Sequence, residues 1–263
     1  MSDPRHLSSG LRWLLLPIGC ISGCAALLAA TPPSLQGRWE VIQVAVDHQD
    51  QPHWLYSPDD PRLLGRELLI NDSTISLNDD SRDCLKPMYS PLPAGSLQRF
   101  VGQQFSRPQA FKTPPHPKLA DFSLKFPDSA VSPMRIGCTP DNSSWKGAWF
   151  IALAPDRLLT NYDNNGYVLV LRRRASTDPI KPTFACSKAH GEAEQTICTS
   201  AALAGYDRSV AAAYRHALGL SGDDSGSLKQ EQIGWLKTRN ACAADADCLT
   251  KSMHDRVDQL MQP

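Results

Sequence analysis

The residues with the most definite chemistry in this 263-residue chain are four cysteines in its C-terminal third. Cysteine thiolates bind zinc, and two thiols can oxidise to a disulfide. The spacings Cys186-x11-Cys198 and Cys242-x5-Cys248 do not match the short knuckles of structural zinc sites. We therefore predict two disulfides. Four cysteines allow three pairings, and we favour Cys186 with Cys198 and Cys242 with Cys248 because each pair closes a short loop.

Two further cysteines lie in the middle of the chain. Cys84 and Cys138 are the only cysteines between residues 31 and 175, so one disulfide between them is the simplest assignment. Disulfides form and persist in oxidising compartments, which predicts that the chain is exported.

The first thirty residues have the pattern of an export signal. Basic residues precede an apolar stretch from Trp13 to Ala30. Within it, residues 21–24 resemble a bacterial lipobox, in which Cys24 is acylated and becomes the mature N-terminus. Ordinary signal-peptidase cleavage after Ala30 is the alternative. Both routes predict a periplasmic or cell-envelope protein, and lipidation, which we favour, would attach it to the outer membrane.

Several charged residues near the C-terminus could act in structure or in binding. Glu194, Asp207 and Arg239 could form a partly buried ion-pair set that fixes the register of helices, and we prefer this interpretation to a catalytic role. Asp223 and Asp224 lie in a polar loop rich in glycine and serine. They could steer association with a basic partner, and the alternative is a solvated connection.

No metal, cofactor or catalytic site is predicted. The pairs Asp59-Asp60 and Asp79-Asp80 could chelate calcium loosely, but such pairs are usually solvated turns. The seven histidines show no ligand spacing, and the sequence contains no nucleophile elbow, phosphate-binding glycine loop or HExxH motif. We therefore expect no metal, no cofactor and no enzymatic activity.

Composition excludes several classes of protein. The chain has 27 basic and 27 acidic residues, so it lacks the basic surplus of a nucleic-acid-binding protein, and we expect no nucleic-acid partner. A hydrophobic content of 41% is too high for a disordered chain. The sequence thus indicates a folded protein; its oligomeric state is left open.

The pattern changes near residue 177 and divides the chain into two modules. Residues 31–175 contain short alternating apolar segments, whereas residues 183–263 have a helical period after a polar linker at 176–182. We therefore predict an α+β protein, with an N-terminal antiparallel β-barrel or sandwich followed by a small disulfide-linked helical domain.

The β-rich module is expected to be built from hairpins. Frequent prolines between residues 85 and 120 predict loops with only short strands there, and Asn164-Asn165-Gly166 predicts a tight hairpin turn. The expected strands are 35–44, 67–70, 73–77, 145–153, 157–162 and 167–171. An early Gly-x-Trp at Trp39 and a late strand ending in residues 172–174, all arginine, resemble the lipocalin arrangement, in which a tryptophan packs under an arginine.

The helical module is expected to contain three main helices. Asp207 and Tyr214 share a stripe of the first, and a last helix runs from about residue 248 to 261. Ser227 and Gln230 have the spacing of a capping box at the start of the middle helix. Trp235 shares a face of that helix with apolar residues, which is typical of core rather than of a binding surface.

Spaced residues across 183–261 resemble the LprI-type lysozyme inhibitor family. This resemblance implies small disulfide-linked helical domains in exported bacterial proteins, often lipoproteins. The positions that carry it include the four cysteines and Glu194, Asp207, Tyr214, Gln232, Trp235, Arg239 and Arg256.

The resemblance implies binding and inhibition of a lysozyme-type glycoside hydrolase. Such enzymes use two carboxylates in a groove, so an inhibitor need only occlude that groove. Asp223 and Asp224 are our candidate contacts. One alternative is a non-catalytic adaptor or lipid-binding protein of the envelope that acts through its β module. Another is immunity against a muramidase toxin.

Overall fold

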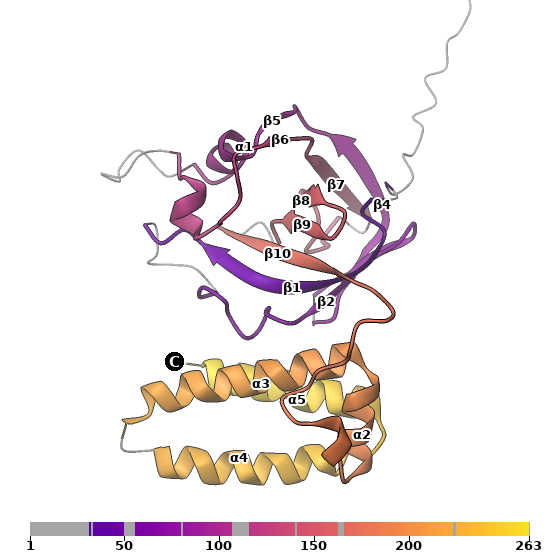
Figure 1. The fold of residues 1–263 in the computed structure, drawn as a ribbon, viewed down its shortest axis with the longest axis vertical. Helices are drawn as coiled ribbons and strands as arrows, with labels where there is room; N and C mark the ends of the chain where they lie inside the picture. Colours follow the sequence, from indigo (N-terminus) through magenta and orange to yellow (C-terminus); the bar gives the residue numbers. More distant parts are fainter. Residues whose placement is uncertain are drawn as a thin grey trace, which may run out of the picture.

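The computed structural model describes residues 32, 34–49, 56–79, 81–106, 116–139, 141–162, 166–222 and 225–262. The export segment with Cys24 and the candidate contacts Asp223 and Asp224 lie outside these ranges, so their predicted roles stay predictions. A β-barrel stands above a layer of helices (Figure 1). This confirms the α+β class and selects the barrel over the sandwich.

The barrel is closed and consists of eight antiparallel strands in the order β1-β10-β9-β8-β7-β4-β3-β2. Closure removes the unpaired strand edges that an open sheet would expose. The strands are β1 (Gly37–Val46), β2 (Glu67–Ile70), β3 (Thr74–Leu77), β4 (Cys84–Pro91), β7 (Met134–Thr139), β8 (Trp149–Ala154), β9 (Arg157–Thr160) and β10 (Tyr167–Arg174).

The barrel interior is filled by side chains. Alternate residues of each strand point inward, because side chains of a strand alternate between the two faces of a sheet. Aromatic residues occupy much of the interior, and they include Trp39, Trp145, Phe150, Tyr162 and Tyr167. This packed core supports the walls of the barrel.

One end of the barrel is closed by the contact that the lipocalin resemblance predicts. The Arg173 guanidinium lies 4.0 Å from the ring centroid of the buried Trp39. Arg173 also donates to the carbonyl oxygens of Ser34, Gln36 and Pro155. The arginine thereby ties the last strand to the residues that precede the first.

The outer face of the barrel carries a second apolar core. The short helix α1 (Leu97–Gln104) and the turn η1 (Leu119–Phe122) cover one side of β1, β8, β9 and β10. Phe100 packs edge-on against Trp149 with ring centroids 5.1 Å apart. The two-residue strands β5 (Gly95–Ser96) and β6 (Ala130–Val131) pair beside α1.

The expectation of loops with only short strands between residues 85 and 120 is wrong. This segment contains most of the eight-residue strand β4 and all of α1. Pro87 is tolerated in β4 because the register with β7 shifts between Leu85 and Met88, where a ladder bond is already missing. Cys84 and Cys138 form the predicted disulfide between β4 and β7, with Cα atoms 5.0 Å apart.

The helical module packs its helices around one apolar core. Leu203, Tyr206, Val210, Met253 and Val257 are buried there. Its elements are η2 (Cys186–Lys188), α2 (Glu192–Thr199), α3 (Ala201–Leu220), α4 (Ser225–Asn240) and α5 (Ala246–Met261).

Two helix starts differ from the predictions. Helix α4 begins at Ser225, so Ser227 lies inside its first turn and not at a cap. Helix α5 begins two residues before Cys248, because the Asp245 side chain accepts hydrogen bonds from the N–H groups of Asp247 and Cys248, each at 3.0 Å. Such a cap satisfies backbone donors that the helix itself leaves free.

Candidate functional site

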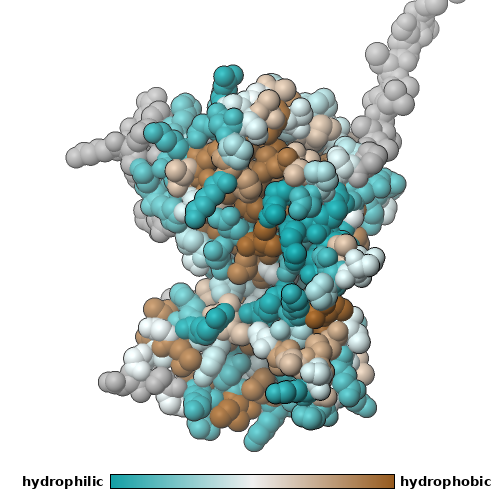
Figure 2. All heavy atoms as spheres, in the orientation of Figure 1, coloured by the Kyte–Doolittle hydropathy of each residue, from teal (hydrophilic) through white to brown (hydrophobic). Residues whose placement is uncertain are grey.

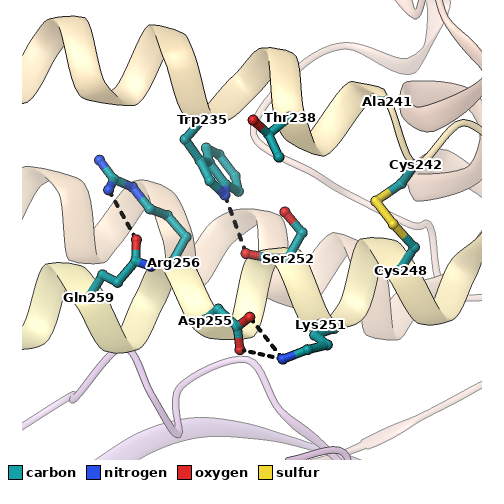
Figure 3. A pocket seen from close by; sticks show the side chains of 10 residues that line it. All are labelled: Trp235, Thr238, Ala241, Cys242, Cys248, Lys251, Ser252, Asp255, Arg256 and Gln259. Carbon is teal, nitrogen blue, oxygen red and sulfur yellow. Dashed lines mark hydrogen bonds and ion pairs between the residues drawn. A yellow bond between two sulfur atoms is a disulfide. The ribbon is translucent and has the colours of Figure 1, made fainter.

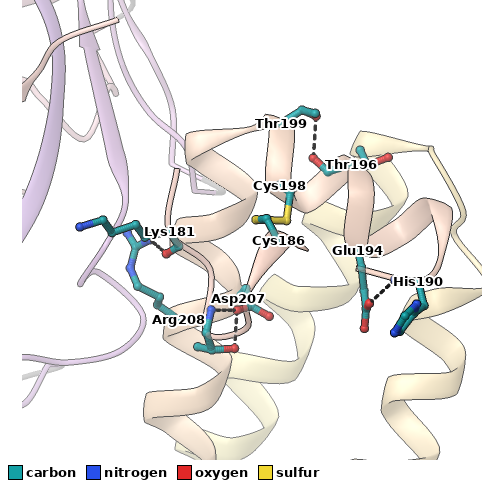
Figure 4. Close-up of a disulfide and its surroundings, with 10 residues drawn as sticks. Lys181, Cys186, His190, Glu194, Thr196, Cys198, Thr199, Asp207 and Arg208 are labelled. Atoms are coloured by element: carbon teal, nitrogen blue, oxygen red, sulfur yellow. Dashed lines mark hydrogen bonds between the residues drawn. A yellow bond between two sulfur atoms is a disulfide. The ribbon is translucent and has the colours of Figure 1, made fainter. Parts of the chain in front are cut away.

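The helical module is held together by two disulfides at one end. Cys186 pairs with Cys198, and Cys242 pairs with Cys248. These are the favoured pairings of the sequence analysis. The first bond ties η2 to α2 (Figure 4), and the second ties the end of α4 to the start of α5.

Asp207 is the polar centre of this module. It is buried on α3, where its carboxylate accepts hydrogen bonds from the Thr183 N–H and hydroxyl, each at 2.6 Å. Arg239 of α4 lies 3.5 Å away and forms an ion pair with it. Burial lowers the pKa of Arg239, and the charge of Asp207 opposes that shift. Asp207 therefore joins α3 and α4 to Thr183, the residue that follows the linker.

Glu194 does not join this pair by direct contact. Its carboxylate accepts a hydrogen bond of 3.0 Å from the His190 N–H (Figure 4). In the part of the chain that the structure describes, it forms no ion pair with Arg239. The predicted set of three is therefore a pair, because Glu194 closes the turn before α2.

The remaining positions of the resemblance lie between α4 and α5 or against the core. Gln232 accepts from the Arg256 Nε at 3.0 Å, and the Trp235 indole N–H donates to the Ser252 carbonyl oxygen at 3.3 Å. Trp235 and Tyr214 are partly buried against the helical core. Their packing agrees with a structural role.

Glu40 forms an ion-pair cluster where the two modules meet. Its carboxylate lies 2.8 Å from Arg172, 3.4 Å from Arg174 and 2.6 Å from Arg208. Arg208 belongs to α3 and the other two arginines to β10. The cluster therefore links the barrel to the helices. Figure 2 shows hydrophilic side chains at the narrow junction between the two modules.

A second set of junction contacts was not predicted from the sequence. A Cβ atom added at Gly205 would lie 2.3 Å from the Gly65 carbonyl oxygen, so the two backbones approach very closely. Beside them the Ser209 hydroxyl donates to the Leu64 carbonyl oxygen at 2.8 Å, and Tyr206 donates to that of Asn78. The isolated glycine inside a helical pattern was the one available signal.

Of the acidic pairs considered as calcium ligands, Asp80 lies outside the described ranges, and Asp60 and Asp79 are engaged in other contacts. Asp60 is buried, and both of its oxygens accept hydrogen bonds from Ser57 or Arg62. Asp79 accepts from Ser81 and from the Tyr162 hydroxyl. Within the described ranges, no group of three or more histidine, cysteine or acidic side chains is arranged to hold a metal ion.

The fold defines a disulfide-stabilised helical module joined to a closed β-barrel. Residues 186–260 match the family model described as lysozyme inhibitor LprI. No curated protein and no solved structure gave a significant match to the chain. The disulfides fit an oxidising compartment. None of the helices in the described part of the chain is both long and apolar enough to span a membrane.

Proposed function

We propose that this chain is an exported, non-catalytic envelope protein that binds lysozyme-type muramidases and inhibits them by occluding the active-site groove. The match of residues 186–260 to a lysozyme inhibitor family is the observation that carries the proposal. Three disulfides and the N-terminal signal pattern support a periplasmic location. Acylation at Cys24 would attach the protein to the outer membrane.

The α3–α4 loop is the proposed contact with the enzyme. Its flanks, Leu220 and Ser225, lie at the end of the helical module opposite the disulfides (Figure 1). Leu220 is 73% exposed, so an apolar side chain stands beside the loop that contains Asp223 and Asp224. An apolar anchor beside acidic residues suits a basic enzyme surface, because charge steers association and apolar burial slows dissociation.

The direct test is a muramidase assay with the purified chain and intact disulfides. The protein is titrated against several lysozyme classes that act on a cell-wall suspension. Stoichiometric loss of activity with at least one class is expected. No effect on any class would overturn the proposal and direct attention to ligands of the barrel.

The role of the loop is tested with a double substitution, Asp223→Asn and Asp224→Asn. Inhibition should weaken, and the difference from the native chain should shrink at high salt because exposed charges are screened. A matched control replaces Asp141 and Asp156 by asparagine. These carboxylates of the barrel are 84% and 65% exposed. Their substitution changes the net charge by the same amount but leaves the loop intact. Equal inhibition by both double variants would exclude the loop.

A further inference from the structure

Helix α4 is attached to the module by few buried contacts. Arg239 is its only buried residue among those whose burial the structure describes. A groove of about 450 Å³ runs between α4 and α5 (Figure 3). Trp235 and Thr238 line it from α4, Ser252, Arg256 and Gln259 line it from α5, and the Cys242–Cys248 disulfide closes one end. This volume lies within the range of pockets for small ligands.

Arg256 is a buried cation in the wall of this groove. Only 7% of the residue is exposed. Its Nε donates to Gln232 at 3.0 Å, and its Nη1 donates to Gln259 at 3.3 Å (Figure 3). Its Nη2 is buried and has no hydrogen-bond partner within the described part of the chain. Both partners are neutral amides, and no carboxylate there lies within 4.0 Å of the guanidinium.

The Arg256 guanidinium lacks the anionic partner that a bound ligand could supply. A buried cation is costly unless an anion compensates it. Arg239, the neighbouring buried arginine of this module, has Asp207 as its counter-ion. Arg256 has no such partner within 4.0 Å among the described residues. Burial lowers its pKa, and the more distant charge of Glu231 opposes that shift. The unpartnered Nη2 of the guanidinium can donate a charge-assisted hydrogen bond to a carboxylate oxygen.

We propose that the groove between α4 and α5 binds the carboxylate group of a small acidic ligand, with Arg256 as the counter-ion. This site goes beyond the proposed inhibition of muramidases and does not depend on it. Lys251, the other cation of the groove, already pairs with Asp255 at 3.0 Å. Arg256 is therefore the cation of this groove that forms no direct ion pair with any residue that the structure describes.

Charge also selects this groove over a second one, which lies nearer the α3–α4 loop. Arg256 and Gln259 line both grooves. The second groove contains Glu231, whose charge would repel a bound carboxylate. In the first groove, the partly buried Trp235, the Thr238 and Ser252 side chains and the Gln259 amide can contact the rest of a sugar or a short peptide.

The experiment measures binding to the full chain by calorimetric titration with two matched pairs of probes. N-acetylmuramic acid is compared with N-acetylglucosamine, which lacks the lactyl carboxylate. N-acetyl-D-alanyl-D-alanine is compared with its C-terminal amide. In at least one pair the acid should bind roughly tenfold or more tightly than its neutral counterpart, as expected for a charge-assisted hydrogen bond. The pair that responds identifies the source of the carboxylate.

Variants assign the binding to Arg256. Arg256→Gln should lower the affinity for the acid roughly tenfold to a hundredfold, and Arg256→Lys should lower it less. Arg215→Gln is the matched control, because Arg215 is an exposed arginine of α3 outside the groove. Thr238→Trp leaves Arg256 intact and fills the groove from an exposed position, so it should also abolish binding.

Several outcomes would overturn the proposal. They are equal binding of acid and neutral probes, no binding of either acid, and unchanged binding by Arg256→Gln. If Arg256→Gln does not fold, Thr238→Trp decides, and retained binding by that variant contradicts the site. A chain that binds the acid but inhibits no muramidase would keep this site and reject the proposed function.

Discussion

The guanidinium of Arg66 lies 3.4 Å from the centroid of the Tyr206 ring, and this contact joins the barrel to the helical module. Both side chains are buried. Burial lowers the pKa of Arg66 to about 10. A cation that has lost water gains more from the face of an aromatic ring than an exposed one does. The modules therefore share a specific interface, and the barrel sets the orientation of α3.

The close approach of Gly205 to Gly65 makes the interface sensitive to a single methyl group. Gly205→Ala would place a carbon 2.3 Å from a backbone oxygen, so the modules must move apart. We expect a loss of about 1–3 kcal/mol in the free energy of unfolding, as in other overpacked sites. Thermal or denaturant unfolding measures it.

Gly219→Ala is the control for that experiment. Gly219 lies in the same helix and has nothing within 4 Å of an added Cβ. Alanine there should be neutral or should stabilise by up to about 1 kcal/mol, because it favours the helix. Equal stabilities of the two alanine variants would show that the interface tolerates the methyl group.

The ion pair between Asp207 and Arg239 should be strongly coupled. Asp207→Asn leaves the Arg239 guanidinium, whose side chain is 5% exposed, without its charged partner. We expect a loss of about 3–5 kcal/mol in the free energy of unfolding. The double variant Asp207→Leu/Arg239→Met should lose less stability than the sum of the losses of the single variants Asp207→Leu and Arg239→Met. Additive losses in denaturant unfolding would contradict the coupling.

Asp60 should make stability depend on pH. Burial alone would raise the pKa of Asp60, but hydrogen bonds from the Arg62 side chain and from the Ser57 and Arg62 N–H groups hold it below its usual value of 3.8. A pKa that is lower in the folded state adds stability above the unfolded value, and this stability is lost as the pH falls through the folded value. The native chain should thus lose its advantage over Asp60→Asn on acidification below about pH 4.

The measurement is the free energy of unfolding of both chains at pH 7 and pH 3. Asp141→Asn serves as the control, because the Asp141 side chain is 84% exposed and its pair with Lys146 is a surface pair. Its difference from the native chain should stay small at both pH values. A constant gap between the native chain and Asp60→Asn would refute the assignment.

The three disulfides should differ in value according to the loops that they close. Their sequence separations are 54, 12 and 6 residues for Cys84–Cys138, Cys186–Cys198 and Cys242–Cys248. Chain entropy predicts contributions of about 4, 3 and 2 kcal/mol in that order. Paired Cys→Ser substitutions followed by denaturant unfolding measure them. The reverse order would show that loop entropy does not control their contributions.

Local patterns were enough to predict most of the elements of this fold. Alternating apolar residues identify β1, and a continuous apolar run after a hairpin turn identifies β10. The helical period identifies α3 and α5. All these patterns depend on neighbours along the chain. The prolines prevented the prediction of β4. Whether a proline breaks a strand depends on the partner strand, and the bulge beside Pro87 forms only in the pairing of β4 with β7.

The sequence by itself predicted the two modules and the cysteine pairings favoured by short loops, because both follow from spacing and local chemistry. The resemblance to lipocalins predicted the tryptophan under an arginine. Only the tertiary structure decided which charges meet. It paired Asp207 with Arg239, directed Glu194 to His190 and left Arg256 with neutral partners. The junction at Gly205 is of the same kind. Contacts between distant residues depend on how whole elements pack, and packing directions are not encoded in the local pattern.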